Sequence, residues 1–374
     1  MYKYKIDELL LLENISYIPD DKPLISILNY KNKKVSDYLN KIKIDELIDD
    51  KDYQSYMNGY DFKNLLTAMK NNQRIMNLTI LDTHVDEAYG GGGGISCVLL
   101  DEKENEVFIV FRGTSNNEWT DDFIGANTID TFQQINALEW YKQIYNNLHL
   151  EKYYITVLGH SKGGNKAKYI TLLDDSVDRC VSIDGQGFSD KFFDHYKKEI
   201  LARKHKIENH NIDFDYVNIL MNDIGEKTYY VGHEYGRGAF AEAHCPNTFF
   251  NFTSLGIYEI KVNPLGQRPE MQILDQFVNS MIRSAINDKE RSENNKLVGM
   301  LVERAFSMNP NNMDLADYVA FLCDTISDPK YIDNAAYLLS FCIIYTKNNP
   351  NLLFSERSLS LMAERIILLT NWSN

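Results

Sequence analysis

The segment around Ser161 combines a possible nucleophile with the glycines that such a nucleophile needs. Residues 154–170 read YITVLGHSKGGNKAKYI, a short apolar run followed by Gly-His-Ser-Lys-Gly and then a helical pattern. A serine on a sharp turn between a strand and a helix has strained backbone angles, so the positions two before and two after it must be almost free of side chain. Gly159 and Gly163 meet this requirement. The pattern predicts a nucleophilic Ser161; the alternative is a glycine-rich turn with an incidental serine.

Two backbone groups near this turn could stabilise negative charge on a substrate oxygen. The turn places the backbone N–H of Lys162 at a helix N-terminus, where unpaired N–H groups and the helix dipole favour an anion. A second β-like run ends in Arg112-Gly113-Thr114. Gly113 allows a close backbone approach, and Thr114 offers its N–H together with its hydroxyl. We therefore predict Lys162 and Thr114 as oxyanion donors and interpret Arg112 as a structural ion-pair partner.

A nucleophilic serine also requires a base and a carboxylate that orients it. One common chain order on α/β folds places the serine first, then the acid, then the histidine. Asp223 follows the apolar run 214–221, and His244 lies in a loop farther along. Catalytic groups gather at the carboxyl ends of strands in an open α/β sheet. The predicted triad is Ser161, Asp223 and His244.

Other acids and another histidine compete for these roles. Asp184 ends the β-like run that follows the Ser161 helix, and Asp213 and Asp215 flank Phe214, where the run 214–221 begins. His233 lies in the same connection as His244 and is the alternative base. His160 adjoins the nucleophile, but a residue beside the serine of such a turn points away from it. We interpret His160 as a packed, structural side chain.

The order of β-like and helical segments predicts the architecture that would hold these residues. Short apolar or β-branched runs alternate with helical patterns, which is typical of a mainly parallel sheet covered on both faces. The runs that we expect to be strands are residues 78–87, 94–102, 106–114, 153–159, 179–185 and 214–221. The second and third are joined by a polar turn and predict a hairpin.

The chain divides into three parts by composition. Residues 1–60 are polar, with weak periodicity, and predict a helical or irregular extension. Residues 61–265 contain the β-like runs and all the candidate site residues. Residues 266–374 repeat apolar positions at three- and four-residue spacing, which predicts a helical appendage.

Composition excludes several classes of function. The formal net charge is −14 and no Lys/Arg-rich stripe occurs, so a nucleic acid is not an expected partner. The five cysteines are scattered and form no CxxC pair, and HEYGR lacks the second histidine of a zinc helix, so we expect no metal and no other cofactor. The N-terminus does not read as a signal peptide, and the apolar stretch 334–346 is too short to span a bilayer. We expect a cytoplasmic protein.

Four motifs together resemble a known family. VFIVFRGTSNNEWTDDF, VLGHSKGGNKA, VSIDGQGF and ILMNDIGE, spread over residues 78–252, are similar to the class 3 (fungal-type) lipases. They look most like the bacterial lipase-like α/β-hydrolase domains that have long been classed as proteins of unknown function. The resemblance implies an α/β-hydrolase fold with Ser161 as nucleophile, Thr114 and Lys162 at the oxyanion, Asp223 as acid and His244 as base. It also implies that the segment after Arg-Gly-Thr acts as a lid.

Two classes of function are consistent with these observations. The first is a serine ester hydrolase that acts on a small acyl ester or a lipid, including a phospholipid, through an acyl-enzyme; transfer of the acyl group to an acceptor other than water would use the same residues. The second is a catalytically weak or inactive hydrolase-like module that binds a protein partner through its C-terminal helices. An active-site serine probe distinguishes the two.

Overall fold

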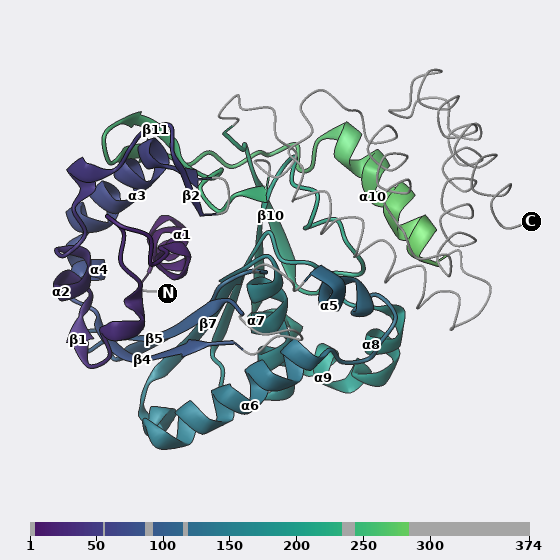
Figure 1. The fold of residues 1–374 in the computed structure, drawn as a ribbon. Coiled ribbons are helices and arrows are strands. Elements are labelled where there is room, and N and C mark those ends of the chain that lie inside the picture. The colour runs from purple at the N-terminus through teal and green to yellow at the C-terminus, as the bar shows by residue number, and fades with distance from the viewer. Residues whose placement is uncertain (1–3, 55–56, 87–92, 115–118, 234–243, 284–374) are drawn as a thin grey trace, which may run out of the picture.

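A central sheet of eight strands organises the part of the chain that the computed structural model describes, residues 4–54, 57–86, 93–114, 119–233 and 244–283 (Figure 1). In spatial order the strands are β1 (Lys33–Lys34), β4 (Thr79–Val85), β5 (Ile95–Asp101), β6 (Glu106–Phe111), β7 (Tyr154–His160), β8 (Arg179–Ile183), β9 (Ile207–Ile212) and β10 (Glu226–Tyr230). Neighbours from β1 to β6 are antiparallel, and those from β6 to β10 are parallel. The predicted α/β fold with a mainly parallel sheet is confirmed.

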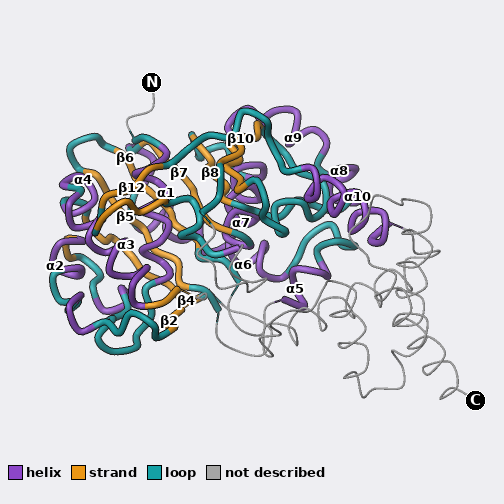
Figure 2. The backbone as a smooth tube through the Cα atoms, turned by 90° about the horizontal axis from the view of Figure 1, so that it is seen from above, coloured by secondary structure: helices purple, strands orange, loops and turns teal. Residues whose placement is uncertain are grey.

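Helices cover both faces of this sheet, as Figures 1 and 2 show from two directions. One face carries α1 (Ile6–Asn14), α2 (Val35–Leu39), α3 (Gly59–Asn71) and α4 (Gln73–Met76). The other carries α6 (Phe132–Asn147), α7 (Lys162–Leu173), α8 (Asp190–His195) and α9 (Lys197–Arg203). Alternate strand residues face opposite cores, as period-two geometry requires: Phe108 and Val110 pack toward α1, and Ile109 packs toward α6 and α7.

Shorter elements complete the described structure. They are α5 (Trp119–Ile124), α10 (Pro269–Arg283), the hairpins β2 (Asp52–Gln54) with β3 (Met57–Asn58) and β11 (Asn251–Ser254) with β12 (Ile257–Glu259), and the 3₁₀ turns η1 (Ile15–Tyr17), η2 (Ile27–Asn29), η3 (Ile44–Glu46), η4 (Leu150–Lys152) and η5 (Lys204–Lys206). Within the described ranges, no helix combines the length and the apolar character that crossing a bilayer would require.

Five of the six expected strand runs correspond to β4, β5, β6, β7 and β8, whereas β1, β9 and β10 of the sheet were not expected. The hairpin of β5 and β6 is confirmed, with Ser96 opposite Phe111. The strand expected at 214–221 is wrong, because the strand that pairs with β8 is β9, whose sequence is the polar IENHNI. Residues 213–221 form turns instead, and their apolar side chains, Val217 and Ile219 among them, pack together with α10. The error shifts the expected carboxyl end of the strand by about nine residues.

The first helix is buried on nearly every side. Leu9, Leu10, Leu11 and Leu12 are each at most 1% exposed and belong to the core that lies between α1 and the sheet. The segment 1–60 that we expected as an extension therefore contributes directly to one face of the α/β core. The boundaries near residues 60 and 265 stay predictions. In the expected appendage only α10 is described, and residues 284–374 lie outside the described residues.

Helix α1 also carries a buried acid, Glu13. Its side chain is fully buried, and neither carboxylate oxygen has a hydrogen-bond partner among the described residues. Burial raises the pKa of Glu13 well above its ordinary value, and the nearby Arg112 opposes that rise only in part. The folded protein therefore holds the Glu13 proton to a higher pH than the unfolded chain does.

This difference predicts how stability depends on pH. Glu13 costs stability increasingly as pH rises above the ordinary range for a glutamate, because only the unfolded chain ionises there freely. We expect Glu13→Gln to exceed the wild type in free energy of unfolding by an amount that grows between pH 4 and pH 8, measured by urea denaturation. Glu102→Gln, at an exposed side chain, should show no such growth. An equal effect of Glu13→Gln at both pH values would contradict the prediction.

Candidate functional site

Ser161 occupies the strained turn between β7 and α7. Its backbone has φ 59° and ψ −126°, a conformation that costs free energy for a residue with a side chain. The turn is held by neighbouring strands, since the Ser161 N–H donates to the carbonyl of Ile183 over 2.9 Å. Glycine is required beside it, because a β-carbon at Gly163 would lie 2.0 Å from the carbonyl oxygen of Phe111. The structure therefore presents Ser161 on a turn of the nucleophile-elbow type.

The loop after β6 touches this turn directly. A β-carbon at Gly113 would lie 2.8 Å from the Cβ of Ser161, so only glycine permits the approach. The next residue, Thr114, donates its hydroxyl to the Oδ2 of Asp122 over 2.7 Å. That hydroxyl is already committed, which leaves the backbone N–H of Thr114 as the group of this residue that could meet an oxyanion.

His244 is held by a buried carboxylate. Its Nδ1 lies 2.5 Å from the Oδ2 of Asp215, whose side chain is fully buried. The other oxygen of Asp215 accepts the backbone N–H groups of Val217 and Asn218, each at 2.8 Å. The carboxylate therefore has a defined orientation and directs the other ring nitrogen, Nε2, away from itself. Among the described residues that Nε2 is buried without a hydrogen-bond partner.

The imidazole of His244 lies beside the elbow. Its ring stacks on the ring of His160, the residue before Ser161, with centroids 4.5 Å apart and an interplanar angle of 29°. Tyr216 lies on the same imidazole with centroids 5.5 Å apart. The structure thus brings two of the three predicted triad residues into one place. The hydrogen bond from Ser161 to Nε2 is not formed.

The third predicted residue, Asp223, lies elsewhere. Its Oδ1 is 2.5 Å from the Nζ of Lys168, and its Oδ2 is 3.4 Å from the Nζ of Lys227. Asp215 takes the place on His244 that the sequence analysis assigned to Asp223. The reason is the position of β9: because that strand ends at Ile212, Asp215 and not Asp223 follows its carboxyl end.

The remaining candidates have other partners. Asp213 pairs with Arg268 at 3.3 Å. Asp184 accepts the N–H of Ile212 at 2.7 Å, and burial followed by the nearby carboxylate of Asp215 raises the pKa of Asp184 well above its ordinary value. The alternative base His233 donates its backbone N–H to Thr248 in the connection before the final described segment. Of these acids and Asp215, it is Asp215 whose carboxylate contacts the imidazole of His244.

The side chain of Lys162 has a role that the sequence analysis did not find. It is fully buried, and its Nζ lies 3.1 Å from a carboxylate oxygen of Asp121 and 3.1 Å from one of Asp122, both in α5. Burial disfavours the ammonium charge, but the two carboxylates outweigh burial and raise the pKa of Lys162. The elbow is therefore tied to α5 by charge as well as to β8 by its backbone.

Two more lysines of α7 are buried in the same way. Lys166 pairs with Asp86 at 2.6 Å, and Lys168 pairs with Asp223. Each lysine of this helix thus anchors a carboxylate from a different segment of the chain. A sequence signal for these pairs was absent, because a lysine in a helix is ordinarily an exposed residue and its partners here are distant in sequence.

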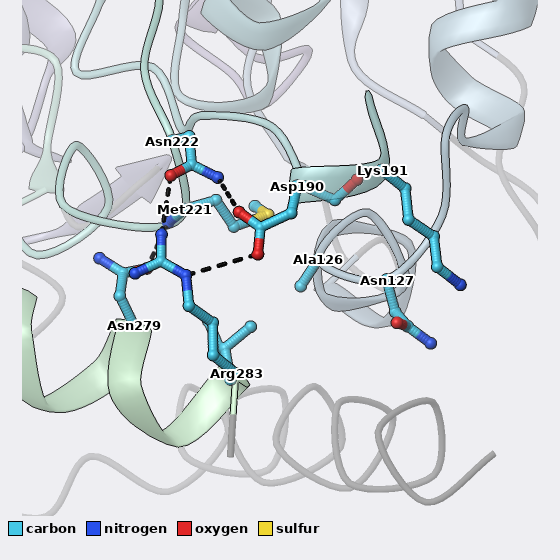
Figure 3. A pocket seen from close by; sticks show the side chains of 10 residues that line it. Ala126, Asn127, Asp190, Lys191, Met221, Asn222, Asn279 and Arg283 are labelled. Carbon is cyan, nitrogen blue, oxygen red and sulfur yellow. Dashed lines mark hydrogen bonds and ion pairs between the residues drawn. The ribbon is translucent and has the colours of Figure 1, made fainter. Parts of the chain in front are cut away.

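A separate pocket lies between α8 and the end of α10 (Figure 3). It encloses about 340 Å³ of empty space, part of it open to solvent. Its polar groups pair with one another: Asn222 donates to Asp190 and accepts from Arg283, each at 2.7 Å. Ser161, His244 and Asp215 do not line it. Within the described ranges, no group of His, Cys, Asp and Glu side chains is arranged to hold a metal ion.

Fold and geometry together define the class of this protein: an α/β protein with a mostly parallel sheet and a serine elbow beside a histidine–aspartate pair. Comparison with family models gives one match, the family described as Mbeg1-like, over residues 69–208. Comparison with curated proteins gives no match.

The solved structures that match include fungal lipases. The Yarrowia lipolytica Lip2 lipase is 13% identical, with 60% of this chain and 76% of that chain covered and a TM-score of 0.36. The Rhizomucor miehei lipase–propeptide complex is 16% identical, with 49% and 72% covered and a TM-score of 0.30. Lipase II from Rhizopus niveus is 15% identical, with 41% and 66% covered and a TM-score of 0.28. At these identities and TM-scores the matches assign neither a family nor a chemistry to this chain.

The pairing of Asp223 with Lys168 predicts a structural effect. Among the described residues, Lys168→Met leaves the buried Asp223 side chain with Lys227 as its one cationic partner. The loss of one partner of a buried pair costs roughly 3–5 kcal/mol. We expect that decrease in the free energy of unfolding by urea, and we expect Lys168→Met/Asp223→Leu to recover most of it. Lys31→Met, which breaks the surface pair with Asp82, should change stability by less than about 1 kcal/mol. If Lys168→Met were as stable as the wild type, the pairing of Lys168 with Asp223 would be contradicted.

Proposed function

We propose that the protein is a serine ester hydrolase with Ser161 as nucleophile, His244 as base and Asp215 as the carboxylate that orients the base. The observation that carries the proposal is the combination of a strained serine elbow with a buried Asp215–His244 pair stacked beside it. The strained backbone of Ser161 costs conformational free energy, and burial of the Asp215–His244 pair costs desolvation free energy. A catalytic role for the Ser161 oxygen accounts for both costs.

The proposed reaction proceeds through an acyl-enzyme. The Oγ of Ser161 attacks the ester carbonyl while Nε2 of His244 takes its proton, and Asp215 holds the Nδ1–H and stabilises the imidazolium. The backbone N–H groups of Lys162 and Thr114 face the oxygen that becomes negative. His244 then returns the proton to the leaving alcohol, and a water deprotonated by the same imidazole hydrolyses the acyl-enzyme.

An acyl ester is the substrate class that this arrangement supports. The motif resemblance to class 3 lipases favours lipid esters, including phospholipids, within that class. The resemblance also suggested a lid after Arg-Gly-Thr, and only α5 of that segment is described. Of the C-terminal helices in residues 266–374 that we expect to bind a protein partner, α10 is described, and residues 284–374 lie outside the described residues.

The role of Ser161 predicts covalent labelling. A fluorophosphonate probe should label the wild type, because it reacts with an activated serine, and should fail to label Ser161→Ala. The adduct is measured by intact-protein and peptide mass spectrometry. Ser189→Ala, which removes a helix-capping serine away from the elbow, is the control and should label normally. A folded wild type that never labels would overturn the proposal and favour the non-catalytic alternative.

The base and the acid are tested by paired substitutions. Asp215→Asn should reduce kcat for a p-nitrophenyl ester roughly ten-thousand-fold, and His244→Ala by at least as much, because each removes the group that drives proton transfer. Asp223→Asn and His233→Ala should keep kcat within about ten-fold of the wild type, measured well below the unfolding temperature of each variant. A severe loss in Asp223→Asn with wild-type activity in Asp215→Asn would restore the original assignment.

A further inference from the structure

One phenol oxygen joins the two halves of the candidate site. Tyr17 lies in η1, directly after α1, and its side chain is only 3% exposed. Its Oη accepts the backbone N–H of Gly113 over 3.1 Å and lies 2.7 Å from the Nδ1 of His160. Gly113 precedes the oxyanion candidate Thr114, and His160 precedes Ser161. A residue from the first twenty of the chain therefore contacts both the loop after β6 and the last residue of β7.

The protons in this cluster can be assigned by counting donors and acceptors. Tyr17 has one proton to donate, and burial raises its pKa well above the ordinary value, so the phenol is neutral. If Tyr17 donates to Nδ1 of His160, only the Nε2–H of His160 lacks a partner among the described residues. If Nδ1–H donates to Tyr17 instead, both the phenol proton and Nε2 lack one. The first arrangement is favoured, and it places the His160 proton on Nε2.

The charge of His160 affects proton transfer to His244, because the two imidazole rings stack on each other. The ring of His244 lies 4.5 Å away, centroid to centroid, and in the proposed reaction it becomes positively charged. A second positive imidazole at that distance would oppose proton transfer to His244. Burial, then His244 and Arg112, all lower the pKa of His160 well below its ordinary value. The same neutral state follows from the donated Tyr17 proton.

Three charged residues lie near the stacked rings of His160 and His244. Arg112 lies over the ring of Tyr17, with its guanidinium carbon 4.9 Å from the ring centroid. The buried Glu13 raises the pKa of Tyr17, and Arg112 lowers it. The Oδ2 of Asp215 lies 2.5 Å from the Nδ1 of His244 and provides the carboxylate that an imidazolium there would need. Among the described residues, His160 bonds Tyr17 through Nδ1 and its Nε2 has no hydrogen-bond partner, so no bonded carboxylate balances a charge there and the positive charge belongs on His244.

We propose that Tyr17 is a positioning residue of the site, which holds a neutral His160 against the base His244 and holds the Gly113 loop beside Ser161. The proposal rests on the serine hydrolase function proposed above. It assigns a part of the catalytic geometry to the N-terminal segment, outside residues 69–208 that the family model matches.

The test compares two substitutions that remove a single buried hydroxyl. Tyr17→Phe removes both contacts and keeps the ring. Tyr38→Phe removes a hydroxyl that donates to the carbonyl of Ile25 over 2.7 Å in an equally buried place away from the site. We expect Tyr17→Phe to lower kcat for a p-nitrophenyl ester about ten-fold with KM within about two-fold, because ground-state binding is untouched. Tyr38→Phe should leave kcat unchanged. Wild-type kcat in Tyr17→Phe, or equal losses in both variants, would overturn the proposal.

A spectroscopic arm separates this proposal from the proposed function. In ¹⁵N-histidine-labelled protein, the His160 ring, assigned by its loss in His160→Gln, should show a neutral Nε2–H tautomer. That signature should change in Tyr17→Phe and persist in Tyr38→Phe. An Nδ1–H tautomer or a charged ring in the wild type would overturn the proposal even if esters are hydrolysed. A wild type that hydrolyses no ester but shows the expected tautomer would overturn the enzymatic function, and with it the catalytic role of Tyr17, while leaving its bond to His160 in place.

Discussion

The strained backbone of Ser161 is the feature on which the rest of the site depends. A φ of 59° at a residue with a side chain persists only where the surroundings determine it. Here they do so by close packing of backbone, because β6 and the elbow approach one another at distances that exclude any β-carbon at Gly159, Gly163 or Gly113. The same approach brings the Thr114 loop next to the serine. The positions of the proposed nucleophile and the proposed oxyanion donor thus depend on one steric constraint between two parallel strands.

Buried charge provides a second level of organisation around that turn. Helix α7 directs Lys162, Lys166 and Lys168 inward, and each pairs with a carboxylate from a different connection of the sheet. Such pairs contribute little net stability, since desolvation offsets much of the attraction, but a displaced partner would leave an unpaired buried charge. Alternative positions of these connections are therefore costly. Helix α7, which begins directly after Ser161, therefore also determines where the connections that carry these carboxylates lie.

The N-terminal segment belongs to the site as much as to the core. Helix α1 closes one face of the sheet, and the turn after it places Tyr17 against His160 and Gly113. The residues that define the elbow lie within the range that the Mbeg1-like family model matches, whereas Tyr17, Asp215 and His244 lie outside it. The chemistry that we propose therefore requires contacts between parts of the chain that a match to the central segment does not cover.

The sequence by itself determined the local features of this protein. Short apolar or β-branched runs indicated five of the eight strands of the sheet and the hairpin of β5 and β6, and the glycines around Ser161 indicated the elbow, because both patterns act between near neighbours in the chain. It also suggested His244 as the base. Only the tertiary structure decided which carboxylate meets His244. The strand β9 has a polar sequence that forms a strand because β8 and β10 pair with it, while the apolar run 214–221 packs into turns against α10. Asp215 and Asp223 are the same kind of side chain eight residues apart, and their different partners, His244 and Lys168, are set by contacts over long sequence distances that no local pattern records.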